Sequence, residues 1–84
     1  MIVDQNKAIR LDPTIADAYN TRGLAYLAKW EPDKAIADFN KAIELNPYDA
    51  IFYENRGRAY SLWNRDLEKA YADWDKAKEL GYED

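Results

Sequence analysis

The stretch NKAIELNP, residues 40–47, has an almost identical copy earlier in the chain, NKAIRLDP at residues 6–13. A third and more divergent copy, DKAKELGY, occupies residues 75–82. The first two copies start 34 residues apart, and the second and third start 35 residues apart. A period of this length is typical of stacked-repeat proteins, in which each structural unit packs against its neighbours.

The segments between these copies repeat at the same spacing. The pairs that match at a step of 34 are Tyr19 and Tyr53, Gly23 and Gly57, and Tyr26 and Tyr60. The pairs that match at a step of 35 are Ala35 and Ala70, Phe39 and Trp74, and Ala42 and Ala77. The second unit therefore carries one inserted residue, between Tyr60 and Ala70.

Helical signals fill each unit. Apolar residues recur every three or four positions, as on one face of an α-helix. Asp12-Pro13 and Asn46-Pro47 are expected to end helices, because proline lacks the N–H donor and restricts the residue before it. Glu31-Pro32 is expected to start one. Asn64 is expected to adopt a left-handed conformation, and Asp66 to cap the following helix. The sequence thus predicts five helices, over residues 2–11, 15–29, 33–45, 49–63 and 67–80.

Small and aromatic residues alternate along these predicted helices. Gly23 and Ala35 are expected to let two antiparallel helices approach closely, while Tyr19, Tyr26 and Phe39 fill the space on either side. Dense interdigitation of large and small side chains is what a close-packed interior requires.

The pattern AYNTRGLAYLA at residues 18–28, followed by AIADFNKAIELNP at residues 35–47, closely resembles the tetratricopeptide repeat in its prokaryotic form. The resemblance covers the whole chain, as the second helix of a partial repeat (1–13), a repeat (14–47) and a repeat with the C-terminal end (48–84). It implies one all-α domain, a superhelix of stacked antiparallel helix hairpins.

The turns between paired helices depart from the family pattern. The glycine usual in this turn is replaced by Trp30 and by Asn64. Tryptophan is strained at a positive φ, so we expect the first of these turns to be rearranged around Pro32.

In the family that the chain resembles, the first helix of each repeat lines a concave groove for an extended peptide or a partner's helix. The positions that the resemblance assigns to this groove are Asp17, Asn20, Thr21, Leu24, Leu27, Ile51, Glu54, Asn55, Arg58, Ser61 and Leu62. The amides of Asn20 and Asn55 are suited to bond a peptide backbone, and Leu24 and Ile51 to supply apolar contacts. The alternative is a purely structural repeat segment of a larger protein.

Arg22 and Arg56 recur beside the two glycines, and Asp38 and Asp73 recur with them. One interpretation is an anion-binding site built on the arginines. The other is a structural ion pair that ties neighbouring helices. Duplication of both partners favours the structural pair.

The amino-acid composition argues against several classes of function. The chain has no cysteine and no histidine, so the usual nucleophile–base relays and metal ligands are missing. We therefore expect no enzyme activity, no cofactor and no metal. The net charge of −4 disfavours nucleic acid and anionic membranes, and leaves single-stranded RNA binding as a remote alternative. A protein or peptide partner is expected, and a cytoplasmic location is the default.

The two ends of the repeat differ. Lys78 stands where Ile9 and Ile43 stand in the earlier copies, and we expect it to face water at the end of the array, with Gly81 as a left-handed cap. At the other end, residues 1–11 lack a preceding partner helix. This edge indicates either a fragment of a longer array or a homodimer through residues 1–11.

Overall fold

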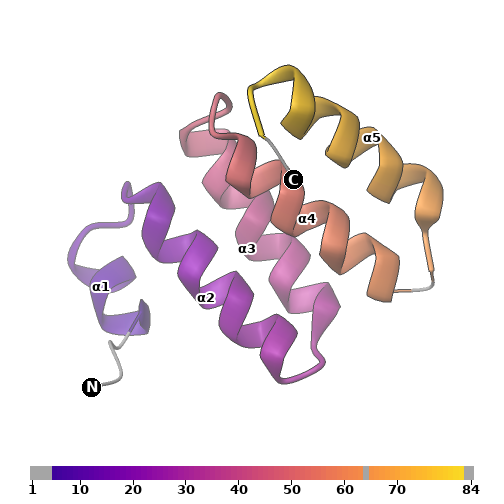
Figure 1. The fold of residues 1–84 in the computed structure, drawn as a ribbon. Coiled ribbons are helices and arrows are strands. Elements are labelled where there is room, and N and C mark those ends of the chain that lie inside the picture. The colour runs from indigo at the N-terminus through magenta and orange to yellow at the C-terminus, as the bar shows by residue number, and fades with distance from the viewer. Residues whose placement is uncertain (1–4, 64, 83–84) are drawn as a thin grey trace.

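The computed structural model describes residues 5–63 and 65–82. This part of the chain folds into five α-helices and contains no strand (Figure 1). The helices are α1 (Gln5–Leu11), α2 (Ala16–Ala28), α3 (Pro32–Leu45), α4 (Ala50–Leu62) and α5 (Leu67–Glu79). The predicted all-α class and the five helices are confirmed. The predicted start of the first helix at residue 2 lies outside the described residues.

The helices form hairpins that stack side by side in chain order. α2 packs against α3 and α4 against α5, and the two hairpins join where α3 contacts α4. α1 packs against α2, where it takes the place that α3 has beside α4 (Figure 1). Hairpins that nest sequentially in this way are what a repeating sequence requires, because each unit buries its apolar face only against a neighbour.

The ends of the helices follow from local chemistry. Pro32 begins α3, where its missing N–H has no intrahelical partner to lose. An Asp49 carboxylate oxygen accepts the N–H of Ile51 at 3.0 Å, and an Asp66 carboxylate oxygen accepts the N–H of Lys69 at 3.3 Å. These contacts satisfy backbone donors that the first helical turn leaves free. The predicted capping role of Asp66 is confirmed.

The turn after α2 contradicts the sequence-based expectation. Trp30 does adopt the left-handed conformation, with φ of 61°, and the N–H of Glu31 donates to the carbonyl of Tyr26 at 2.9 Å. This is the hydrogen-bond pattern of a glycine-terminated helix, so the expected rearrangement around Pro32 was wrong. The hydrogen bonds to the last turn of α2 keep Trp30 in the left-handed conformation, although tryptophan disfavours it.

Among the described residues, two more adopt the left-handed conformation, one after α4 and one after α5. In the turn after α4 the left-handed residue is Arg65, with φ of 51°; the expectation for Asn64 falls outside the described residues. Gly81 has φ of 105°, and the N–H of Tyr82 donates to the carbonyl of Ala77 at 2.9 Å. The predicted glycine cap after α5 is confirmed.

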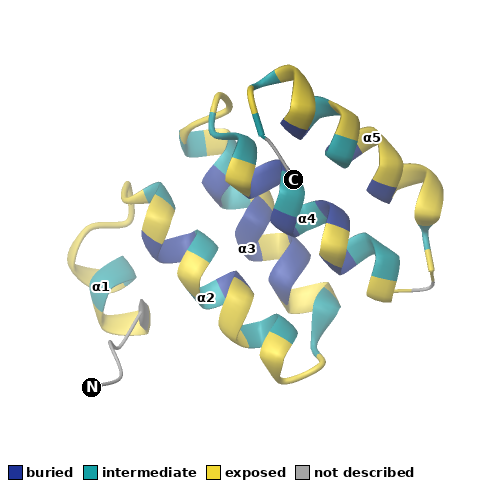
Figure 2. Ribbon diagram, in the orientation of Figure 1, coloured by how far each residue is buried: buried dark blue, intermediate teal, exposed yellow. Residues whose placement is uncertain are grey.

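The buried residues gather where paired helices cross (Figure 2), and small residues there face aromatic ones. Phe39, Ala35 and Ala70 are fully buried. A Cβ atom added to Gly23 would lie 2.6 Å from Cε1 of Phe39, and one added to Gly57 would lie 2.5 Å from Nε1 of Trp74. Both glycines are therefore needed for the close approach of an aromatic ring.

Among the described residues, no helix is both long enough and apolar enough to cross a lipid bilayer. The longest, α3, has 14 residues, against the roughly 20 apolar residues that a span needs.

Candidate functional site

The candidate groove lies along α2 and α4, which run side by side in the same direction (Figure 1). An amide–amide contact fixes their alignment: Nδ2 of Asn55 donates to Oδ1 of Asn20 at 2.9 Å. Asn55 is only 5% exposed. Its side chain therefore connects the two helices, and Asn20 lies above it as the more accessible amide.

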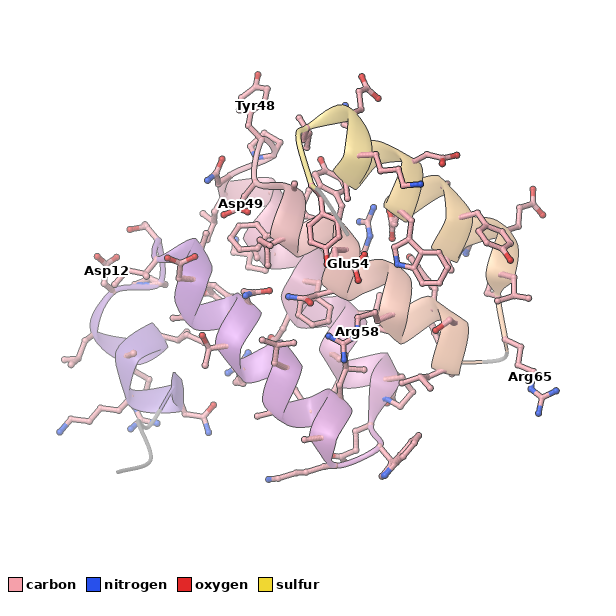
Figure 3. All side chains as sticks on the ribbon, viewed as in Figure 1. Asp12, Tyr48, Asp49, Glu54, Arg58 and Arg65 are labelled. Atoms are coloured by element: carbon pink, nitrogen blue, oxygen red, sulfur yellow. The ribbon has the colours of Figure 1, made fainter. Side chains whose placement is uncertain are left out.

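The predicted groove residues differ widely in exposure. The exposed ones are Asp17, Thr21, Leu24, Ile51, Arg58 and Leu62. Those of intermediate burial are Asn20, Leu27, Glu54 and Ser61, and Asn55 is buried. Figure 3 shows Glu54 and Arg58, one helical turn apart, on the same side of α4.

Two of the predicted residues already have structural contacts. Leu27 packs against the buried cluster that includes Ile36 and Phe39. The hydroxyl of Ser61 donates to the carbonyl of Arg58 within α4 at 2.7 Å. Leu27 therefore belongs in part to the core, and Ser61 has its donor engaged by its own helix.

Leu24 and Ile51 are two of the exposed apolar residues in the predicted groove. Leu24 is 36% exposed and Ile51 is 45% exposed. Leu24 follows Asn20 by one helical turn, and Ile51 precedes Asn55 by one turn. Since Asn20 and Asn55 pair, the two aliphatic side chains lie on opposite sides of the amide pair, about 12 Å apart along the helix axes.

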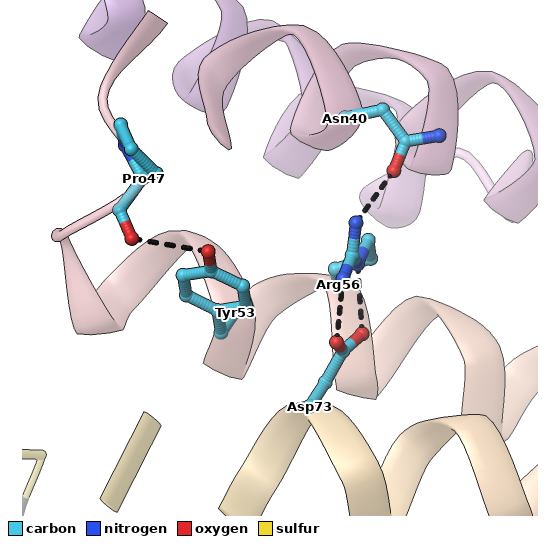
Figure 4. Close-up of polar contacts among 5 residues, drawn as sticks. All are labelled: Asn40, Pro47, Tyr53, Arg56 and Asp73. Carbon is cyan, nitrogen blue, oxygen red and sulfur yellow. Dashed lines mark hydrogen bonds and ion pairs between the residues drawn. The ribbon is translucent and has the colours of Figure 1, made fainter. Parts of the chain in front are cut away.

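The arginines are engaged between helices. Arg56 donates from Nε and Nη2 to the two carboxylate oxygens of Asp73, at 2.8 and 2.7 Å. Its Nη1 donates to Oδ1 of Asn40 at 2.9 Å (Figure 4). One guanidinium on α4 thereby joins α3 and α5.

Arg22 repeats this arrangement one unit earlier. It forms the same two bonds with Asp38, at 2.8 and 2.7 Å, and donates to Oδ1 of Asn6 at 2.9 Å. The structural interpretation of the repeated pair is confirmed. An anion-binding site on these arginines loses its basis, because the donors are already directed at acceptors of the chain.

Aromatic rings surround each guanidinium. The Cζ atom of Arg56 lies 5.6 Å from the ring centre of Tyr53 and 5.9 Å from that of Tyr60, within the range of cation–π attraction. Hydrogen bonding to Asp73 raises the pKa of Arg56 above its ordinary value, against the opposing effect of burial. The same cause raises the pKa of Arg22 beside Asp38.

Sequence reasoning missed a pocket of about 300 Å³ between α4, α5 and the C-terminal turn. We call it the α4–α5 pocket; it is lined by Glu54, Tyr71, Trp74, Asp75, Lys78 and Tyr82. Tyr71 and Trp74 meet edge to face, with ring centres 5.6 Å apart and an angle of 73° between the rings. The signal for it was the third copy of the repeated stretch, in which Lys78 replaces an isoleucine and Tyr82 replaces a proline.

The described residues contain no cluster of three or more acidic residues arranged to hold a metal ion. The carboxylates of Asp38 and Asp73 accept hydrogen bonds from arginine, and those of Asp49 and Asp66 cap helices. The contacts of these four carboxylates are thus structural.

Comparison with known proteins identifies the repeats. Two family models, each described as tetratricopeptide repeat, match residues 16–49 and residues 39–79. A solved structure titled "Crystal structure of MamA" superposes with a TM-score of 0.84 at 34% sequence identity. The alignment covers 90% of this chain and 44% of that chain, so this chain spans less than half of its length. No curated protein sequence matches the chain.

Proposed function

Because the chain belongs to the tetratricopeptide repeat family, we propose that it is a protein-interaction module that binds an extended peptide or a partner helix along α2 and α4. Repeats of this family mediate protein–protein interaction or scaffolding, and the family is typically non-catalytic. The proposal concerns where on this chain a partner binds.

The observation that carries the proposal is the exposure of Leu24 and Ile51 on either side of the Asn20–Asn55 pair. Their separation of about 12 Å along the helix axes corresponds to roughly four residues of extended peptide, a spacing that puts both side chains on one face. A peptide with two apolar side chains at that spacing would contact both. The Nδ2 group of Asn20 lies between them, with a backbone carbonyl of the peptide as its natural acceptor.

Charged residues of the predicted groove would favour partners of complementary charge. Asp17 and Glu54 are acidic, Arg58 is basic, and all three are at least partly exposed. Exposed ion pairs contribute little affinity, but they oppose partners with the wrong charge. Two helices offer limited contact area, so we expect micromolar or weaker binding by an isolated peptide.

The test is a selection of random peptides on the immobilised chain, followed by binding measurements with a groove variant. That variant carries Leu24→Ala, Ile51→Ala and Arg58→Ala, all at exposed positions. Asn55 is left intact because its burial makes it structural. The matched control carries Leu11→Ala, Tyr48→Ala and Lys41→Ala, outside the groove.

We expect the groove variant to bind the selected peptide at least tenfold more weakly and the control variant to bind it normally. Equal binding by both variants, with unchanged helix content, would place the partner elsewhere. Failure to select any peptide would favour a scaffolding role.

Self-association through the N-terminal edge is a second candidate. Leu11, at the end of α1, is 77% exposed, and α1 contacts only α2 among the described helices. We expect sedimentation of wild type to show a concentration-dependent dimer that Leu11→Lys abolishes. A monomer across a hundredfold range of concentration would exclude it.

A further inference from the structure

The α4–α5 pocket occupies a face of α5 whose equivalent on α3 is covered by a helix. In the 35-residue register, Tyr71, Asp75 and Lys78 correspond to Ile36, Asn40 and Ile43. Ile36 is 6% exposed and belongs to the same buried cluster as Ala59 of α4. Tyr71, by contrast, is 58% exposed.

Two contacts within the chain show which group the equivalent face of α1 and of α3 binds. α2 brings Arg22 to Oδ1 of Asn6, and α4 brings Arg56 to Oδ1 of Asn40. In both cases an arginine on one helix reaches an acceptor at the same position of the preceding helix. Asp75 holds that position on α5, and no arginine in residues 5–63 or 65–82 pairs with it.

Asp75 is a stronger hydrogen-bond acceptor than Asn6 and Asn40, which hold the equivalent positions on α1 and α3. A carboxylate binds a guanidinium more tightly than an amide oxygen does, because the hydrogen bond is assisted by opposite charges. Glu54 adds a second carboxylate to the pocket, and Tyr71, Trp74 and Tyr82 add aromatic walls. The two tyrosine rings near each internal arginine belong to the arginine's own helix, so aromatic walls on the acceptor side are a feature of this pocket.

We propose that the α4–α5 pocket binds the guanidinium of an arginine carried by a helix of a protein partner. Asp75 and Glu54 accept its hydrogen bonds, and the rings of Tyr71, Trp74 and Tyr82 enclose the cation. The partner helix would lie on α5 as α4 lies on α3. This surface shares Glu54 with the predicted groove along α2 and α4 but otherwise has different lining residues, and neither proposal depends on the other.

Lys78 gives the proposal a directional test. Its ammonium group lines the same pocket and repels an incoming guanidinium. Removal of this charge must therefore strengthen binding, whereas removal of the Asp75 charge must weaken it. A surface that merely adheres to helices through apolar contact has no reason to respond to these two changes in opposite directions.

The probe is a helix-stapled peptide of residues 16–28, ADAYNTRGLAYLA, which carries Arg22. This sequence pairs an arginine with the preceding helix in the chain itself. Matched peptides replace that arginine by lysine or by glutamine. Binding to the full isotope-labelled chain is followed by NMR at the amides of Tyr71, Asp75 and Lys78 and at the indole N–H of Trp74.

We expect the arginine peptide to shift these resonances and to bind several-fold more tightly than the lysine peptide, because only guanidinium offers a planar fork of donors. We expect Asp75→Ala to weaken binding about tenfold and Lys78→Met to strengthen it about threefold. The control, Asp33→Ala, removes an exposed carboxylate from α3 and should have no effect. Circular dichroism confirms that each variant is folded.

Four results would overturn the proposal. The first is that no resonance shifts at millimolar peptide, and the second is that the lysine or glutamine peptide binds as tightly as the arginine peptide. The third is that resonances of α1 and α3 shift because the peptide displaces α2. The fourth is that the shifts are confined to the neighbourhood of Leu24 and Ile51. The last would leave the groove as the binding surface and remove the pocket. Tighter binding of a trimethyl-lysine peptide would reassign the pocket to quaternary ammonium groups.

Discussion

Arg56 and Asp73 form a two-pronged ion pair between α4 and α5, with donor–acceptor distances of 2.8 and 2.7 Å. The Asp73 side chain is 7% exposed and the Arg56 side chain 22%. Because the pair is largely removed from water, loss of one partner leaves a poorly solvated charge.

We predict that Arg56→Ala lowers the free energy of unfolding by about 3 kcal/mol. A double-mutant cycle with Asp73→Ala should give a coupling energy of about 1–3 kcal/mol, measured by urea denaturation. The Arg22–Asp38 pair, with the same geometry, serves as the internal repeat of the measurement. Independent effects of the two substitutions would show that the contact contributes nothing to stability.

Gly57→Ala should destabilise the protein by about 1–3 kcal/mol. Alanine ordinarily stabilises a helix interior by about 1 kcal/mol relative to glycine, so the sign is diagnostic. The new Cβ would lie 2.5 Å from Nε1 of Trp74 and 3.1 Å from the carbonyl of Ala70, which forces α4 and α5 apart. Gly23→Ala should destabilise the protein by a similar amount, because its Cβ atom would collide with the ring of Phe39. A rise in the melting temperature of either variant would contradict the packing described here.

Trp30→Gly should stabilise the protein by about 1 kcal/mol. Trp30 has φ of 61° and is 76% exposed, so glycine relieves the strain of the left-handed conformation and loses little packing. Trp30→Ala is the control, because it removes the ring and keeps the Cβ atom. If both variants melt at the same temperature, the strain at this turn is negligible.

Trp74→Phe should leave the stability unchanged or raise it by about 1 kcal/mol. Nε1 of Trp74 is buried and has no hydrogen-bond partner among the described residues, which costs about 1–3 kcal/mol. Phenylalanine already fills the equivalent position, as Phe39, without such a group. The reverse change, Phe39→Trp, should be destabilising. Thermal unfolding of both variants compares the two sites, and a less stable Trp74→Phe would contradict the cost assigned to the indole N–H.

Tyr53→Phe should cost about 1 kcal/mol in the free energy of unfolding. The Tyr53 hydroxyl donates to the carbonyl of Pro47 at 3.0 Å, which ties the start of α4 to the preceding turn (Figure 4). Tyr19 occupies the same position one repeat earlier, and its hydroxyl makes no such bond within the described residues, so Tyr19→Phe is the control. Equal effects of the two substitutions would assign the loss to something other than this hydrogen bond.

Much of the fold was readable from the sequence because its determinants are local. Proline at residues 13, 32 and 47 marks helix boundaries through missing donors and restricted dihedral angles. Gly23 and Gly57 mark the helix crossings. The Arg–Asp pair was predicted correctly because both partners recur together. In each case the chemistry lies on one residue or repeats at a fixed spacing.

The errors and omissions concern contacts that depend on the packed arrangement. Trp30 was expected to avoid the left-handed region, but the hydrogen bonds to the end of α2 hold it there. Asn55 was assigned to the groove from the family resemblance, but in the structure its side chain is buried and donates to Asn20. The contacts of the arginines with Asn6 and Asn40 were missed, because the repeat pattern predicts which helices are neighbours and not which side chains meet between them. The groove assignment itself stays a prediction.

The three-helix contact of each arginine bears on how the array comes apart. α3 receives Arg22 through Asp38 and Arg56 through Asn40, so unfolding of α3 breaks bonds to both α2 and α4. By contrast, α1 contacts only α2, and α5 contacts only α4, among the described helices. Amide hydrogen exchange should accordingly be slowest along α3 and should accelerate toward α1 and α5, with the central helix as the last element to lose its protection.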